Sequence, residues 1–180
     1  MKKLFLSFVS ALFLVNFFPA AAEQPANFSS PYAQSRPAYS QRIHWLDHYD
    51  TATSQARQTS QPILILFTGT NWCPACIKLE KQVLSNSRFA QTLADRLIFL
   101  KAEFPSYTAE SMEASVFYPL LNRYQVSSFP TMVVVNASGQ LLFEVPYQNA
   151  DVDAYLQEIL SKLNNTKNNT DFFISMNKPA

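Results

Sequence analysis

The only two cysteines of this 180-residue chain lie three positions apart, in the segment Trp72-Cys73-Pro74-Ala75-Cys76. The segment follows an apolar run at residues 63–67 that is typical of a buried strand. A strand leading into Cys-x-x-Cys at the start of a helix is suited to thiol–disulfide exchange, because two neighbouring thiols can be oxidised as a pair. The pair can be redox-active, a local structural disulfide or half of a metal site, whereas a wider disulfide framework is excluded.

The position of each thiol on the expected helix predicts a different role for each. At a helix N-terminus, unpaired amides and the helix dipole would favour the thiolate of Cys73. Cys76, one turn further on, would be more buried and less acidic. We therefore expect Cys73 to be the nucleophile and Cys76 to resolve the mixed disulfide. Pro74 suits the first helical turn because it lacks an amide hydrogen, and Trp72 would offer an apolar surface to partner chains.

A second segment, Ser128-Phe129-Pro130-Thr131, comes just before a predicted strand. Proline at a strand entry is explained if the Phe129–Pro130 bond is cis and the loop lies against the cysteine pair. The backbone of Phe129 would then be free to pair with an extended substrate segment and place its disulfide over Cys73. We expect Trp72, Phe129 and Pro130 to bind substrate.

A local structural disulfide and a metal site are the two alternatives for the cysteines. His44 and His48 are spaced i, i+4, which would place both on one face of a helix, and two histidines with two cysteines make a zinc ligand set. Against this, Pro74-Ala75 opens a helix after a buried strand instead of forming a knuckle turn. We expect the histidines to lie at the surface, and we expect neither a metal nor a cofactor.

The N-terminus has the order of a secretory signal peptide. Lys2 and Lys3 precede an apolar run over residues 4–18, and Ala20-Ala21-Ala22 offers a cleavage site. The expected cleavage follows Ala22 and would release the protein into the periplasm; an uncleaved membrane anchor is the alternative.

Cleavage removes two of the 14 basic residues, leaving 12 against 13 acidic ones, so nothing in the charge indicates nucleic-acid binding. Outside the cytosol, a partner must set the redox state of the pair.

The hydrophobic pattern divides the chain into four parts. We expect a signal peptide at residues 1–22, a flexible leader rich in Pro, Ser and Gln at 23–42, one folded domain at 43–163 and a polar, disordered tail at 164–180. Within the domain, helices are predicted over residues 43–60, 74–84, 87–96, 114–124 and 151–163, strands over 63–68, 97–102, 131–136 and 141–146, and a loop over 104–113. This order predicts an α/β fold, a mixed sheet of four to five strands with helices on both faces.

Three segments in this order, residues 67–76, 124–131 and 136–139, resemble the thioredoxin superfamily. The Thr-Gly-x-x-Trp-Cys approach and the Ala-Glu-Phe-Pro segment at 102–105 are similar to exported bacterial thioredoxin-like reductases of the DsbH type. The resemblance covers roughly residues 43–163. It implies a thioredoxin-like fold, with Cys73 and Cys76 as the redox pair and Pro130 as the cis-proline.

Two features depart from the thioredoxin pattern. Thioredoxins carry a buried acid six positions before the first cysteine, where this chain has Phe67. A proton acceptor for Cys76 would then be water, Glu103 or Lys101. The dipeptide between the cysteines is Pro-Ala instead of Gly-Pro, and this dipeptide tunes the potential, so it leaves the direction of electron flow open.

The expected function is that of an exported thiol–disulfide oxidoreductase, a monomer that reduces disulfides of other exported proteins and is recharged by a membrane electron-donor protein. A disulfide-donating oxidase or an isomerase of the same fold is one alternative. A non-catalytic binding module with an inert cysteine pair is the other.

Overall fold

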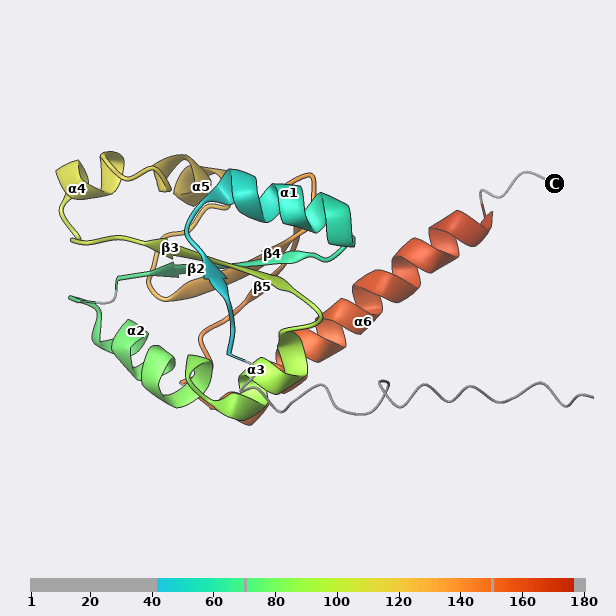
Figure 1. Ribbon diagram of the computed structural model, residues 1–180. Coiled ribbons are helices and arrows are strands. Elements are labelled where there is room, and N and C mark those ends of the chain that lie inside the picture. Colours follow the sequence, from blue (N-terminus) through green and yellow to red (C-terminus); the bar gives the residue numbers. More distant parts are fainter. Residues whose placement is uncertain (1–41, 70, 150, 177–180) are drawn as a thin grey trace, which may run out of the picture. The chain divides into compact units, whose positions relative to one another are not determined.

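The computed structural model describes residues 42–69, 71–149 and 151–176 (Figure 1). The expected signal peptide and nearly all of the expected leader lie outside these residues. Within them, no helix combines the length and the apolar character needed to cross a bilayer.

The centre of the fold is a five-stranded mixed sheet, as the sequence predicted, with the strand order β1-β3-β2-β4-β5. Strands β1, β3 and β2 are parallel, and β4 and β5 are antiparallel to their neighbours. The C-terminal end of β2 therefore lies between the end of β3 and the start of β4, and Phe67 pairs with both Ala102 and Thr131. The strands are β1 Trp45–Leu46, β2 Ile63–Thr68, β3 Ile98–Glu103, β4 Thr131–Val135 and β5 Leu141–Val145.

Helices cover both faces of the sheet and bury both sides of β2 (Figure 1). Leu64 and Leu66 face one core with α2, η2, α3 and α6, whereas Ile63, Ile65 and Phe67 face the other with α1 and α5. Burial on both faces explains why the strand reads as a continuous apolar run. The helices are α1 Tyr49–Thr59, α2 Pro74–Leu79, the π-helix η2 Glu80–Leu84, α3 Ser87–Leu93, α4 Ala109–Glu113, α5 Tyr118–Arg123 and α6 Val152–Met176.

The N-terminal part of the domain differs from the prediction of one helix over residues 43–60. Trp45 and Leu46 form β1, which pairs with Phe99 and Leu100 of β3, and α1 begins only at Tyr49. The edge of β3 offers these residues backbone hydrogen bonds that the local pattern does not show. His44 therefore precedes a strand and His48, with φ −129°, is the N-cap of α1, so the two do not share a helical face.

Two further segments contain more helix than the pattern indicated. The predicted loop at 104–113 includes α4, which begins after Thr108, whose Oγ1 accepts a hydrogen bond from Ser111 N–H at 3.3 Å. The last helix, α6, was expected to end at residue 163 before a disordered tail, but it continues to Met176. Residues 164–176 contain neither glycine nor proline, so no residue in this stretch forces the helix to end.

Tyr155 anchors α6 in the core and should make stability fall at alkaline pH. Its side chain is 1% exposed, its hydroxyl accepts a hydrogen bond from Gln148 N–H at 3.1 Å, and burial raises its pKa from 10.0 to about 12. The folded state thus favours neutral tyrosine, and this contribution is complete below pH 10 and is lost as the pH rises to 12. We expect the wild type to lose about 2 kcal/mol more than Tyr155→Phe over this range. Urea unfolding at both pH values measures the difference; an equal loss in the two proteins would contradict it.

Candidate active site

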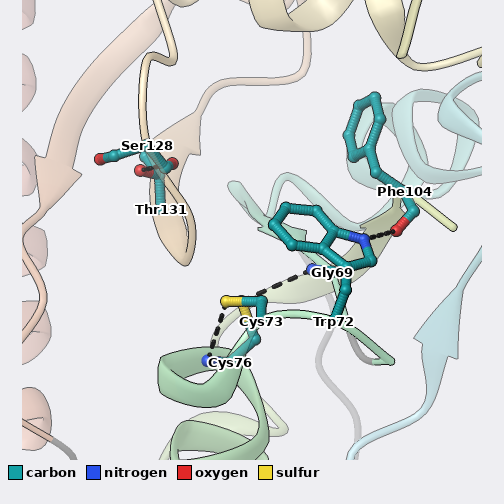
Figure 2. Close-up of a disulfide and its surroundings, with 7 residues drawn as sticks. All are labelled: Gly69, Trp72, Cys73, Cys76, Phe104, Ser128 and Thr131. Atoms are coloured by element: carbon teal, nitrogen blue, oxygen red, sulfur yellow. Dashed lines mark hydrogen bonds between the residues drawn. A yellow bond between two sulfur atoms is a disulfide. The ribbon is translucent and has the colours of Figure 1, made fainter. Parts of the chain in front are cut away.

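Cys73 and Cys76 form a disulfide at the beginning of α2 (Figure 2). Cys73 is the N-cap of the helix, with extended backbone, and its Sγ accepts a hydrogen bond from Cys76 N–H at 3.1 Å. Pro74 occupies the first helical turn, as the sequence predicted. The helix thus directs an amide donor at the sulfur of Cys73, the sulfur that the sequence assigned as nucleophile.

Both sulfurs lie in a nearly closed environment. Cys73 is 5% exposed and Cys76 is 2% exposed, in the expected order. The Gly69 N–H donates to Cys76 Sγ at 3.5 Å, and Gly69 C=O accepts from Cys73 N–H at 2.9 Å. Gly69, the residue directly after β2, therefore holds the first turn of α2 in place.

Trp72 connects the ends of β2 and β3 beside the disulfide. Its Nε1–H donates to the carbonyl oxygen of Phe104 at 2.9 Å, immediately after β3 (Figure 2). The indole ring also lies against Gly69, where an added Cβ would come within 2.3 Å of two ring carbons. The position of Trp72 thus depends on the absence of a side chain at Gly69.

Four aromatic side chains, Trp72, Phe104, Tyr107 and Phe129, form an aromatic cluster next to Cys73. The Phe129 ring lies 5.5 Å from Trp72 and 5.3 Å from Phe104 between centroids, and the Tyr107 ring lies 5.1 Å from Trp72. The structure therefore brings together Trp72 and Phe129, two of the predicted substrate-binding residues. Phe104 and Tyr107 were not identified from the sequence as site residues, because nothing in a segment read as a loop shows which rings it will meet.

The loop before β4 has the predicted conformation. The Phe129–Pro130 bond is cis, Pro130 is buried, and Thr131 Oγ1 donates to the Ser128 carbonyl at 2.7 Å. Because Thr131 pairs with Phe67, this loop starts from the same end of the sheet as the cysteine segment (Figure 2). The rings of Phe129 and Trp72 are in contact, so the two segments lie side by side.

The position of β2 that faces α2, where thioredoxins carry the acid, is not the one that the residue count suggested. Phe67 lies on the sheet face away from α2, and Leu66 is the side chain of β2 that faces the helix. Leu66 pairs with Lys101 of β3, whose Nζ lies 2.9 Å from Oε2 of Glu80. Both side chains of this ion pair are partly buried: Lys101 is 22% exposed and Glu80 is 35% exposed.

Glu80 was not identified from the sequence as a site residue. It lies one helical turn after Cys76, and its N–H donates to the Cys76 carbonyl. Residues four apart share a helical face, so the carboxylate is on the Cys76 side of the helix. Glu103, the other expected candidate, is exposed at the end of β3. Among the described residues, no group of three or more His, Cys, Asp or Glu side chains is placed to hold a metal ion.

Comparison with known proteins places this geometry in a family. The chain is 28% identical over 158 residues to the disulfide bond reductase DsbH of Chlamydia pneumoniae. The matched region covers 87% of this chain and 93% of that protein. It is 19% identical to the thioredoxin-related protein DsbJ of the same organism, over 59% of this chain and 31% of that protein.

Solved structures show the same fold. A DsbH oxidoreductase superimposes with a TM-score of 0.61 at 28% identity, over 73% of this chain and 91% of that one. A thioredoxin from Thermus thermophilus, 22% identical, has a TM-score of 0.52 over 66% of this chain and 85% of that one. The thioredoxin-like family matches residues 44–137, which include β1 to β4 and the Cys73–Cys76 pair. The chain therefore belongs to the thioredoxin-like family.

Proposed function

We propose that this protein is an exported thiol–disulfide oxidoreductase that reduces disulfides in other exported proteins through Cys73 and Cys76. The observation that carries the proposal is the placement of Cys73 as the N-cap of α2, with the Cys76 N–H donated to its sulfur. Similarity to a protein named a disulfide bond reductase, over 93% of that protein's length, supports the same chemistry.

Reduction begins with the thiolate of Cys73 in the reduced protein. Its sulfur attacks one sulfur of the substrate disulfide, and the other substrate sulfur leaves as a thiolate and takes up a proton. The thiolate of Cys76 then attacks Cys73 Sγ, which releases the second substrate thiol and forms the Cys73–Cys76 disulfide. Two electrons pass to the substrate, and the amide directed at Cys73 stabilises its negative charge in the first step.

Cys76 must lose its proton before it can attack, although burial disfavours its charged form. Glu80, one turn further along the same helix, provides a carboxylate that can take this proton directly or through water. Lys101 keeps that carboxylate oriented through the 2.9 Å ion pair. In this arrangement the acid comes from the helix instead of from β2, where Leu66 faces the helix.

The proposal includes the location and the partners. Residues 1–22 act as a cleaved signal peptide, and the domain at 43–163 works in the periplasm as a monomer. Trp72, Phe129 and Pro130 bind the substrate chain. A membrane electron-donor protein reduces the Cys73–Cys76 disulfide after each turnover, because the periplasm contains no reducing thiol pool.

The direction of electron flow is tested by equilibrating the protein with glutathione redox buffers and by measuring insulin reduction. We expect a potential near that of thioredoxin, about −270 mV, and turnover with a chemical reductant. A potential near about −120 mV, typical of strong periplasmic oxidants, would favour the oxidase alternative. A disulfide that resists mild reductant, with no turnover, would favour the binding module.

A further inference from the structure

Tyr107 is a large aromatic side chain that remains exposed beside the redox pair. It is 66% exposed, although its ring is in contact with Trp72, at 5.1 Å, and with Phe129, at 6.5 Å between centroids. Trp72 directly precedes Cys73 in the chain. Tyr107 therefore extends the aromatic cluster outward from the disulfide to solvent.

The segment that carries Tyr107 is held at both ends. Phe104 N–H donates to the Thr68 carbonyl at 2.8 Å, which ties the start of the segment to the end of β2. Thr108 follows Tyr107 and caps α4, and its own N–H donates to Ser106 Oγ at 3.3 Å. The ring contacts restrain the exposed Tyr107 side chain, so this side chain loses little conformational freedom when a partner binds it.

Among the described residues, the other large apolar side chains at the surface are Val116, Leu141 and Tyr147. Single exposed apolar residues are common and need no functional explanation. Tyr107 differs from these three because its ring is in contact with Trp72 and Phe129. Trp72 directly precedes the redox pair, and Phe129 belongs to the loop before β4. Tyr107 is therefore in contact with two of the residues that we propose to bind the substrate chain.

We propose that Tyr107, together with Trp72 and Phe129, binds an aromatic or apolar side chain next to the cysteine of the substrate disulfide. The inference rests on the proposed function, because the occupant is the segment that the protein reduces. A ring or aliphatic chain would bury apolar area against three aromatic surfaces, whereas a small polar side chain would gain little there. The protein would thus prefer substrates with such a residue beside the disulfide.

The test uses two synthetic peptides, each with one intramolecular disulfide, that differ only in having Phe or Ser beside the attacked cysteine. Oxidised glutathione serves as a third substrate. The reduced full-length protein is mixed with each, and the second-order rate constant of disulfide reduction is measured. Tyr107→Ala is compared with Tyr107→Phe, which keeps the ring, and with Leu141→Ala, which removes an exposed apolar side chain at the opposite end of the sheet.

We expect Tyr107→Ala to lose about three- to tenfold in rate with the Phe peptide, the range that one aromatic contact supplies. The rates with the Ser peptide and with glutathione should stay near those of the wild type, as should all rates of Tyr107→Phe and Leu141→Ala. An equal loss on all three substrates would mean that Tyr107 only supports Trp72, and it would overturn the inference while leaving the proposed function intact. A wild type that reduces none of the three substrates would overturn the proposed function itself.

Discussion

Cys76→Ala is expected to stop turnover at the mixed disulfide. Cys73 keeps its position as the N-cap of α2 and can still attack a substrate disulfide, but no second thiol remains to release the product. When the reduced variant is mixed with insulin, covalent adducts should form. They should be visible on non-reducing gels and be assigned to Cys73 by mass spectrometry. Catalysed insulin reduction should fall to the background rate.

Cys73→Ala is the matched control, because it leaves Cys76 as the single thiol. Cys76 is 2% exposed, and its sulfur accepts a hydrogen bond from Gly69 N–H on the strand side. A protein disulfide should therefore not reach it. We expect neither adducts nor turnover from this variant. Equal trapping by the two variants would show that the two thiols do not have the separate roles proposed here.

The parts of the site that the sequence predicted depend on signals that are local in the chain. The apolar run of β2 and the proline at the start of α2 each specify their own segment. The hairpin between β4 and β5 is similar: Gly139 has φ +78°, and Asn136 Oδ1 accepts hydrogen bonds from Ser138 N–H and Gln140 N–H. Because these preferences need no distant partner, the position of both cysteines at the start of α2 followed from them. The cis bond before Pro130 was instead expected from the cysteine motif and from the resemblance to thioredoxins.

The parts that were not predicted depend on contacts between distant segments. Trp45 and Leu46 fit a helical pattern, and only the free edge of β3 makes them a strand. Counting back from Cys73 identified Phe67, but the path of the connection between β2 and α2 decides that Leu66 is the residue facing the helix. Tyr107 acquires its place in the site only because the ends of β2, β3 and the Phe129 loop meet at one end of the sheet.

Gly69→Ala should damage both stability and activity, because the added methyl group would occupy the place of the Trp72 ring. Its Cβ would lie 2.3 Å from Cε2 and Cζ2 of the indole and 2.8 Å from Nε1. The ring would have to move, and the Nε1–H bond to the Phe104 carbonyl would weaken with it. We expect a loss of about 1–3 kcal/mol in the free energy of unfolding, typical of overpacking. Insulin reduction should slow by about tenfold or more, since small displacements of binding groups are costly.

Two comparisons assign this effect to the clash with Trp72. Gly139→Ala is strained to a similar degree, with φ +78° and a Cβ 2.5 Å from the Tyr49 hydroxyl, but it lies at the opposite end of the sheet. It should therefore lower stability and leave the rate of the folded protein unchanged. In a Trp72→Ala background the indole is absent, so Gly69→Ala should add almost no further cost to stability, which gives a strong coupling in the double-mutant cycle. Additive effects of the two substitutions would instead show that Gly69 is required for the backbone of the β2–α2 connection and not for the position of the ring.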